Sequence, residues 1–300
     1  MISKSSMKDK QFKLVISSGK GGVGKSMLAS ALAMLFAKKE KIVAVDADVD
    51  APNLAIWLNE VSDENVQFSQ KISNSFKAVI DENKCNGCGQ CVEKCPFGAI
   101  KIKNGRAKIN PFLCEGCGVC QIICPQKAVD LKPVENGQIK VIKTNYGFPL
   151  VIGQLFPGET GSGKIVTEIK KQAEEISQAE LMLIDSAPGT GCPVIASLRD
   201  AHLAVLITEP TLSGFSDLKR ILELVEHFQI PFKIVVNKWD INRPLTKKME
   251  KEFKDNFLGK ISYDQGIFKA IANLKPILKT KLKAKKEIKE IFKQLYAQTV

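Results

Sequence analysis

The 300-residue sequence lacks a long apolar run. Its longest nearly uninterrupted apolar stretch covers residues 27–37 and is broken only by Ser30. A membrane-spanning helix needs about 20 apolar residues, so the sequence predicts no such helix. The first ten residues, MISKSSMKDK, also lack the apolar segment of a secretion signal. We therefore expect a cytoplasmic protein.

Histidine is scarce as well. The chain has two, His202 and His227, which lie in or beside predicted regular elements, so we interpret both as structural. Apolar residues make up 44% of the chain and charged residues 25%, which is typical of a globular protein of one or two modules. Lysine and arginine outnumber aspartate and glutamate by 44 to 32. The resulting formal charge of +12 raises the question of a nucleic-acid or membrane partner.

Most of the chain alternates short apolar strands with longer helical patterns. Strands this apolar, separated by helices, favour a parallel sheet that is covered on both faces. We therefore predict a doubly wound α/β fold with a mainly parallel sheet. The predicted strands are residues 12–17, 41–45, 150–155, 181–184, 203–208 and 232–236. The predicted helices are residues 27–37, 163–177, 192–199, 213–228 and 244–254, with a further helix that has Asp50 as its N-cap and Pro52 in its first turn.

A cysteine-rich segment interrupts this alternation from about residue 61 to residue 143, and it contains eight of the nine cysteines. We predict a discontinuous host domain, residues 1–60 and 144–300, and an insertion, residues 61–143, with a core at residues 77–133. Short strands are expected in this core, so the insertion is predicted to be a small α+β domain. These strands are residues 78–81, 100–102, 107–110 and 129–131.

A glycine-rich loop follows the first predicted strand. Gly19 to Ser26 reads GKGGVGKS, which matches the phosphate-loop pattern G-x-x-x-x-G-K-[ST] between a strand and a helix. The backbone N–H groups of such a loop converge on phosphate oxygens at a helix N-terminus. We expect Lys25 to hold the β- and γ-phosphates and Ser26 to bind Mg²⁺. The predicted nucleotide contacts are Gly21, Gly22, Val23, Gly24, Lys25, Ser26 and Met27.

A second stretch, Gly158 to Lys164, has the same spacing. Ile165 stands where the pattern needs serine or threonine, so this stretch lacks a magnesium ligand. We interpret it as a turn that leads into the next helix.

Three segments together resemble one family. With its extra lysine, Lys20, the loop resembles the deviant Walker A motif of the MinD/Mrp/nitrogenase-iron-protein class of P-loop ATPases. Residues 45–48 (VDAD) resemble the first switch of that class, and residues 183–189 (LIDSAPG) resemble its Walker B strand and second switch. The resemblance implies that Lys20 reaches the nucleotide of a second subunit. The partner would be a second copy, in a nucleotide-dependent homodimer, or a related ATPase, in a heterodimer.

The resemblance also implies Mg²⁺-dependent hydrolysis of ATP to ADP and phosphate, slow and stimulated by a partner. Lys20 and Lys25 would act with Asp185, which supports the Mg²⁺ shell. Asp48 would orient the attacking water, with Asp46 behind it. Each of these aspartates has an alternative as a helix cap or as an exposed loop acid.

Residues 237–240, which read NKWD, are candidates for binding the nucleotide base. The sequence looks like the N-K-x-D pattern that is often linked to guanine. In the MinD-like class an asparagine at this place contacts adenine, so the resemblance implies that Asn237 binds the base of ATP. Whether Asp240 touches the base stays open.

Two cysteine motifs follow each other at an interval of 29 residues, beginning at Cys85 and at Cys114. Both read C-x2-C-x2-C-x3-C-P, the bacterial ferredoxin run, in which three thiolates bind one 4Fe-4S cluster and the fourth binds the other. Zinc favours paired Cys-x2-Cys motifs and would leave two ligands per repeat unexplained. We therefore expect cluster I on Cys85, Cys88, Cys91 and Cys124, and cluster II on Cys114, Cys117, Cys120 and Cys95.

The insertion as a whole resembles a two-cluster ferredoxin domain, and such inserts occur in a branch of the MinD-like family. The resemblance implies one-electron transfer. Each oxidised cluster with its four thiolates carries a charge of about −2, so the formal charge of the loaded protein would fall to about +8.

Two further features are ambiguous. Cys192 follows the second-switch segment, and it is either a packed small residue or a thiol with a transient cluster or redox role. Residues 269–293 carry nine lysines, and apolar residues fall at helical spacing near the C-terminus. We expect this helix to pack on the ATPase core rather than to bind a membrane, and we do not expect nucleic-acid binding. Its apolar positions are Ile288, Ile291, Phe292, Leu295 and Tyr296.

The sequence thus supports three hypotheses. The first is an ATP-binding and ATP-hydrolysing protein that couples nucleotide-dependent dimer switching to electron transfer through two 4Fe-4S clusters, with a redox partner. The second is an iron-sulfur cluster or metallocofactor assembly carrier or scaffold of the Mrp type, with a metallocofactor protein as its partner. The third is a MinD-like membrane switch with a redox sensor.

Overall fold

The computed structural model describes residues 11–299, which form two compact units. The larger unit comprises residues 11–69, Ile139–Gln154 and 162–299. The smaller unit comprises Gln70–Gln138 together with Leu155–Gly161. The second of these segments lies in the part of the chain that the sequence analysis gave to the host domain.

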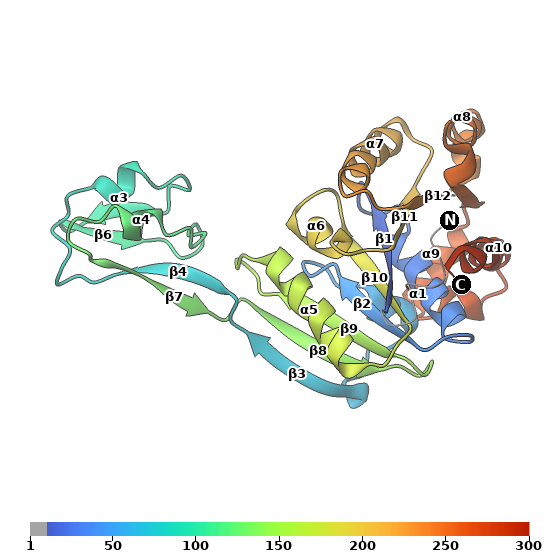
Figure 1. The fold of residues 1–300 in the computed structure, drawn as a ribbon, viewed down its shortest axis with the longest axis horizontal. Coiled ribbons are helices and arrows are strands. Elements are labelled where there is room, and N and C mark those ends of the chain that lie inside the picture. Colours follow the sequence, from blue (N-terminus) through green and yellow to red (C-terminus); the bar gives the residue numbers. More distant parts are fainter. Residues whose placement is uncertain (1–10, 300) are drawn as a thin grey trace. The chain divides into compact units, whose positions relative to one another are not determined.

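The larger unit is built on a nine-stranded sheet with the order β13-β12-β11-β1-β10-β2-β9-β8-β3 (Figure 1). All neighbouring strands from β13 to β9 run parallel. The strands are β1 (Phe12–Ser18), β2 (Ile42–Ala47), β3 (Val66–Ile72), β8 (Gly137–Lys143), β9 (Pro149–Leu155), β10 (Leu181–Pro188), β11 (Leu203–Thr208), β12 (Phe232–Asn237) and β13 (Phe257–Ile261).

The central strands are buried on both faces because helices cover both. β2 and β11 are buried along their whole length. Helices α5, α6 and α7 cover one face of the sheet, whereas α1 and α10 cover the other, and α2 packs against α1 (Figure 1). The predicted doubly wound α/β fold with a mainly parallel sheet is therefore confirmed. The helices are α1 (Lys25–Phe36), α2 (Leu54–Leu58), α5 (Ser162–Ile176), α6 (Cys192–Leu198), α7 (Leu212–His227), α8 (Arg243–Phe253), α9 (Gln265–Ala272) and α10 (Lys283–Thr299).

Helix α10 completes the core on the α1 side of the sheet. Four of its five predicted apolar positions are buried, together with Ala284, and Phe292 meets Phe36 of α1 edge to face, with ring centroids 4.9 Å apart. Exposed lysines occupy other positions of the helix. The prediction that this helix packs on the ATPase core is confirmed. The four buried positions are Ile288, Ile291, Phe292 and Leu295.

The predicted cap of the helix after β2 is wrong. α2 begins at Leu54 rather than near Asp50, and its N-cap, Asn53, makes no side-chain capping bond. Instead, the buried carboxylate of Asp46 accepts a hydrogen bond from the Leu54 N–H at 2.8 Å. A residue at the end of the preceding strand thus satisfies the helix N-terminus, which a search for local capping residues does not detect.

The smaller unit consists of two short antiparallel ladders and two one-turn helices. β4 (Ser75–Ile80) pairs with β7 (Val129–Val134), and β5 (Ile100–Lys103) pairs with β6 (Arg106–Ile109). The four short strands expected in the insertion are therefore present. The helices are α3 (Gln90–Glu93) and α4 (Val119–Ile122), one within each cysteine motif. Among residues 11–299, no helix is long and apolar enough to cross a membrane.

Candidate functional site

The larger unit has a pocket of about 310 Å³ beside the glycine-rich loop. The loop joins β1 to α1, and most of the predicted nucleotide contacts line this pocket. Val23 does not, because its side chain is buried beneath the loop. Residues from four other parts of the unit complete the wall. The lining includes Lys20, Gly21, Gly22, Gly24, Lys25, Ser26, Met27, Asp48, Asn53, Trp57, Pro188, Asn237, Lys238, Tyr263, Asp264, Ile267, Phe268 and Ile271.

Glycine is needed at two places in the loop. Gly24 has φ +96°, and a Cβ there would lie 2.5 Å from Nδ2 of Asn237. A Cβ on Gly19 would lie 2.1 Å from the backbone oxygen of Asp217 in α7. The loop therefore packs directly against β12 and α7, and a side chain at either glycine would displace it.

Lys25 is the charged centre of the site. Its Nζ lies 3.0 Å from Oδ1 of Asp185 and 3.8 Å from Oδ2 of Asp48, and its side chain is only 7% exposed. Burial works against the charge of Lys25, but Asp185 and then Asp48 outweigh burial and raise the pKa of the ammonium group. Burial raises the pKa of Asp48, and the neighbouring Lys25 opposes this effect. Three of the four predicted catalytic side chains, Lys25, Asp48 and Asp185, are therefore brought together, and Lys25 and Asp48 line the pocket.

Asp46 lies behind this group and shapes the loop that carries Asp48. Its two carboxylate oxygens accept hydrogen bonds from the backbone N–H groups of Asp48, at 3.3 Å, and Leu54, at 2.8 Å. Burial, and then the nearby charge of Asp185, raise the pKa of Asp46 to about 8. Asp46 is fully buried and does not line the pocket, so its visible role is to hold this loop.

Asp185 offers a suitable environment for Mg²⁺. Its Oδ2 is buried and has no hydrogen-bond partner among the described residues. Buried polar atoms are nearly always satisfied, so an unpaired carboxylate oxygen indicates a missing ligand or a bound water. The hydroxyl-bearing Ser26 lines the pocket next to Lys25. Mg²⁺ favours oxygen ligands and keeps several waters, so Ser26 would be a ligand of the ion and Asp185 would support its water shell.

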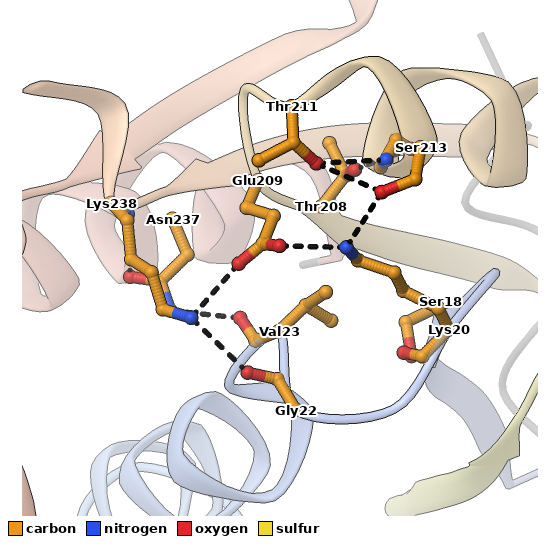
Figure 2. Close-up of polar contacts among 11 residues, drawn as sticks. Ser18, Lys20, Gly22, Val23, Thr208, Glu209, Thr211, Ser213, Asn237 and Lys238 are labelled. Atoms are coloured by element: carbon orange, nitrogen blue, oxygen red, sulfur yellow. Dashed lines mark hydrogen bonds and ion pairs between the residues drawn. The ribbon is translucent and has the colours of Figure 1, made fainter. Parts of the chain in front are cut away.

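Lys20 is held inside its own chain by Glu209, which follows β11. Figure 2 shows Glu209 between two lysines: Oε1 lies 2.7 Å from Nζ of Lys20, and Oε2 lies 2.8 Å from Nζ of Lys238. Lys20 also donates to Oγ of Ser213 at 3.2 Å. Burial works to raise the pKa of Glu209, but hydrogen bonds from Lys20 and Lys238 outweigh burial and lower it. Sequence reasoning missed Glu209, although an acid directly after a buried strand is a signal for a site at the strand's carboxyl end.

Asn237 and Asp240 have structural contacts of their own. Asn237 lines the pocket, and its Nδ2 donates to the carbonyl of Val23 at 2.8 Å, which ties the phosphate loop to β12. Oδ1 of Asp240 accepts a hydrogen bond from the N–H of Tyr263 at 2.8 Å. Asp240 is absent from the pocket lining, so it positions the segment after β13 instead.

The apolar wall of the pocket was not foreseen. It comes from the end of β13 and from α9, with Tyr263, Ile267, Phe268 and Ile271 opposite Trp57 of α2. Phe268 is 59% exposed, which is unusual for a large apolar side chain. A flat aromatic surface beside a phosphate loop is suited to a nucleotide base.

The eight motif cysteines line two small pockets in the smaller unit. Each pocket combines three cysteines of one motif with the fourth cysteine of the other, as the bacterial ferredoxin run requires. One pocket is lined by Cys85, Cys88, Cys91 and Cys124. The other is lined by Cys95, Cys114, Cys117 and Cys120.

Backbone groups around the two pockets repeat at the 29-residue interval. The N–H groups of Ala78 and Ala107 point at Sγ of Cys114 and Cys85, respectively, and both N···S distances are 3.4 Å. A Cβ on Gly87 or on Gly116 would lie 2.1 Å from a backbone carbonyl oxygen. Burial, and then neighbouring cysteines, raise the pKa of the Cys91 and Cys120 thiols. N–H groups directed at sulfur and tight glycine turns fit an iron-sulfur cluster.

Within residues 11–299, no group of three or more His, Cys, Asp or Glu side chains converges as the ligands of a single metal ion would. A four-iron cluster binds each thiolate to a different iron, so its ligands surround a volume instead of meeting at one point. A tetrahedral zinc ion needs its four ligands about 2.0–2.3 Å from one centre. The cysteine arrangement therefore fits a cluster better than zinc.

The remaining sequence features are peripheral to both sites. Cys192 is exposed at the start of α6, away from the other cysteines in the sequence. The second loop, Gly158 to Lys164, has left-handed glycines at Gly158 and Gly161 and leads into α5, and none of its residues lines the nucleotide pocket. Nδ1 of His202 accepts a hydrogen bond from the Lys13 N–H at 3.0 Å, in agreement with a structural role.

Comparison with known proteins identifies the family of the larger unit. A family model described as CbiA: CobQ/CobB/MinD/ParA nucleotide binding domain matches residues 14–277. An uncharacterized protein of Methanocaldococcus jannaschii, MJ0578, is 40% identical over 284 residues, which cover 94% of this chain and 96% of the relative. An iron-sulfur cluster carrier protein of Pyrococcus abyssi is 25% identical over 277 residues, covering 85% of this chain and 75% of the relative.

Among solved structures, the septum site-determining protein MinD of Pyrococcus horikoshii, complexed with Mg-ADP, has a TM-score of 0.59 at 15% identity. The match covers 97% of this chain and 99% of that chain, and it shows a shared fold. A family match over residues 14–277 spans most of the chain, including the phosphate loop and the site around Lys25. The chain therefore belongs to the CobQ/CobB/MinD/ParA nucleotide-binding domain family.

Proposed function

We propose that this protein is a Mg²⁺-dependent ATPase that couples nucleotide-dependent dimerisation to electron transfer through two 4Fe-4S clusters. One observation carries the proposal: a single chain combines a MinD-type phosphate loop with eight cysteines that are divided into two crossed sets of four. A protein that needed only ATP hydrolysis would have no use for the second feature. A simple electron carrier would have no use for the first.

The residues around Lys25 would carry out phosphoryl transfer to water. The Lys25 charge is now balanced by Asp185 and Asp48, and the β- and γ-phosphates of ATP would take over this balance. Asp185 would then hold a water of the Mg²⁺ shell through its unpaired Oδ2, and Asp48 would orient the attacking water. The aromatic wall at Phe268 would receive the base, with Asn237 beside it.

Lys20 would leave Glu209 when two chains form a dimer. As the family resemblance implies, its ammonium group would then meet the phosphates of the partner's nucleotide. Glu209 is only 13% exposed, so the loss of one lysine leaves it paired with the other, Lys238. Lys20→Ala is expected to abolish ATP-dependent dimerisation and hydrolysis but to retain much of the nucleotide binding. Lys25→Ala should weaken nucleotide binding itself. Equal behaviour of the two variants in equilibrium binding and size analysis would argue against the dimer.

The cysteine thiolates would hold the clusters, which supply one-electron oxidation and reduction at low potential when bound. Protein purified without oxygen should contain about eight iron atoms and eight inorganic sulfides per chain, because there are two complete sets of four ligands. Iron and sulfide analysis that gives about four of each, or zinc in place of iron, would contradict the assignment.

Coupling of the two functions can be tested by thermodynamic reciprocity. If ATP changes the affinity of the clusters for an electron, reduction must change the affinity for ATP by the same free energy, typically about 1–3 kcal/mol. We expect the reduction potential of the clusters to shift when ATP is added and the ATP dissociation constant to shift on reduction. Identical ATP binding in both redox states would leave the clusters uncoupled from the ATPase.

An assembly carrier is the second candidate function, and the name of the Pyrococcus abyssi relative favours it. Cys192 is exposed and stands outside both cluster motifs, so it is the thiol available for a transferable cluster. Cys192→Ser with all eight motif cysteines kept separates the two functions. A carrier that uses this thiol would lose transfer of iron to an apo-protein acceptor, whereas an electron-transfer protein would retain its iron content and its redox behaviour.

A further inference from the structure

The β5–β6 ladder of the smaller unit gathers positive charge on one face. Lys101 lies directly opposite Lys108, and Lys103 lies directly opposite Arg106. Residues opposite each other in an antiparallel ladder share a face, and so do residues two apart in one strand. The four cations therefore lie side by side on a single face of a ladder with four residues in each strand.

This arrangement costs folding energy, because like charges directly opposite each other in a ladder repel. Among the described residues, Glu82 alone forms ion pairs with this face, contacting Lys108 and, at 3.7 Å, Arg106. The hydrogen bond from Lys108, together with the charges of Lys108 and Arg106, lowers the pKa of Glu82. One carboxylate thus faces four cations, and the face keeps a large excess of positive charge.

The opposite face of the ladder borders both cysteine pockets: Ala107 lines the pocket of the Cys85 set, and Ile100 and Ile109 line the pocket of the Cys114 set. The backbone of β6 adjoins the Cys85 loop. The N–H of Ala107 points at Sγ of Cys85 at 3.4 Å, and the carbonyl of Gly105 would meet a Cβ on Gly87. Cys88 of the same set is exposed. The cationic face therefore lies on the other side of the ladder from Ala107, a wall of the pocket of Cys85, Cys88, Cys91 and Cys124.

We propose that this face is the docking surface for an acidic one-electron carrier protein that exchanges electrons with the cluster held by the Cys85 set. The inference rests on the proposed function. In the reducing direction the carrier loses one electron and the protein gains it, and no bond is formed or broken. A carrier rather than a nucleic acid is favoured because the ladder adjoins the cysteine pockets and its residues 100–109 include no aromatic side chain on which bases could stack.

The test is association kinetics at low salt between the full chain, purified with its clusters, and an acidic bacterial two-cluster ferredoxin as the probe. Lys101→Glu combined with Lys103→Glu should slow association about tenfold or more and leave dissociation nearly unchanged, because surface charges act mainly through electrostatic steering. Salt should slow association of the parent protein steeply and that of the double variant only weakly. Lys247→Glu combined with Lys251→Glu, two exposed lysines of α8, is the matched control with the same change in net charge.

Equal slowing of association in both double variants would mean that only the net charge of the protein matters. No slowing in either variant would mean that the carrier does not dock on this face. Each of these results overturns the proposal. So does a duplex DNA competitor that binds through Lys101 and Lys103 more tightly than the ferredoxin does. If the glutamate variant loses its fold, Lys101→Gln with Lys103→Gln repeats the test, with about half the loss in log association rate expected. Iron and sulfide analysis of the same samples reports separately on the proposed function.

Discussion

The two halves of the smaller unit follow one plan but carry different charge. The Cys85 half comprises the Cys85 loop with β5 and β6, and the Cys114 half comprises the Cys114 loop with β4 and β7. At the 29-residue interval, the pair Lys103–Arg106 of the first ladder corresponds to Lys132–Lys77 of the second.

In the Cys114 half, the same kind of like-charge pair is neutralised. Lys77 is 7% exposed, lies 3.0 Å from Oε2 of Glu159, and donates to the carbonyl of Pro111 at 2.6 Å. Asp130 stands opposite Val79, where the other half has Lys101 opposite Lys108. One half therefore buries and pairs one cation of this pair, Lys77, whereas the other presents both Lys103 and Arg106 to solvent. Equal backbone constraints with unequal charge agree with the proposed docking surface, because the charge differs between the halves while the geometry around the cysteines is kept.

The largest effect should come from breaking the proposed crossed ligation, in which each half supplies one cysteine to the pocket of the other. Cys124→Ser removes a ligand that lies in the second motif but lines the first pocket. Adding Cys85→Ser should cost nothing further, and about four iron atoms should remain. Adding Cys114→Ser instead should remove both clusters and leave iron near zero. If ligation were not crossed, the two double variants would exchange their iron contents, which iron analysis of protein purified without oxygen decides.

A smaller effect is expected where the two halves share a backbone constraint. Gly87→Ala and Gly116→Ala each place a Cβ 2.1 Å from a carbonyl oxygen at positive φ, so each should lower the free energy of unfolding of the smaller unit by about 3 kcal/mol. Gly98→Ala is the control: its φ is +60° but its Cβ would meet nothing within 4 Å, so only about 1–2 kcal/mol is expected. Denaturant unfolding measures all three. If only one of Gly87→Ala and Gly116→Ala lowered the unfolding free energy as much as expected, the two loops would not be structurally equivalent.

Loss of an ion pair should destabilise the Cys114 half, where the pair Lys77–Glu159 is buried, but not the Cys85 half, where it is exposed. Glu159→Gln leaves the buried Lys77 without a counter-charge, and we expect a loss of about 2–3 kcal/mol in unfolding free energy. Glu82→Gln removes the exposed carboxylate that faces Arg106 and Lys108, and no measurable loss is expected because exposed ion pairs are screened by water and salt. Similar losses in the two variants would show that the cationic face depends on its carboxylate for stability.

The smallest expected effect is a gain in the stability of the smaller unit. Lys101→Asp gives the β5–β6 ladder the acid that Asp130 supplies in the other half, and it relieves the Lys101–Lys108 repulsion. We expect about 0.5 kcal/mol of added stability by denaturant unfolding. The same change should slow association with an acidic ferredoxin. Asp130→Lys, the reverse exchange, should destabilise slightly without improving association.

Local patterns in the sequence were sufficient to predict six of the nine strands of the sheet, the phosphate loop and both cysteine motifs, but not β3, β8 and β13. The end of β11, at Thr208 and Glu209, shows what local patterns could not predict. Glu209 acts through its ion pairs with Lys20 and Lys238. In the same network, Lys20 donates to Ser213, which lies 193 residues later in the sequence. Such contacts form only when parallel strands align their carboxyl ends. Helix α9 (Gln265–Ala272), which carries part of the apolar wall of the pocket, was not predicted. Asp46 was placed correctly behind Asp48, but its bond to the Leu54 N–H was not foreseen.

The crossed ligand sets have a consequence for the order in which the chain is made. The Cys85 loop leaves the ribosome first, yet its fourth ligand, Cys124, is the last of the eight to be synthesised. The Cys114 set, begun later, already has its outlying ligand in Cys95 and is complete at Cys120. The motif that is synthesised first therefore has its set of four cysteines completed last. A nascent chain that stalls before residue 124 can complete only the Cys114 set.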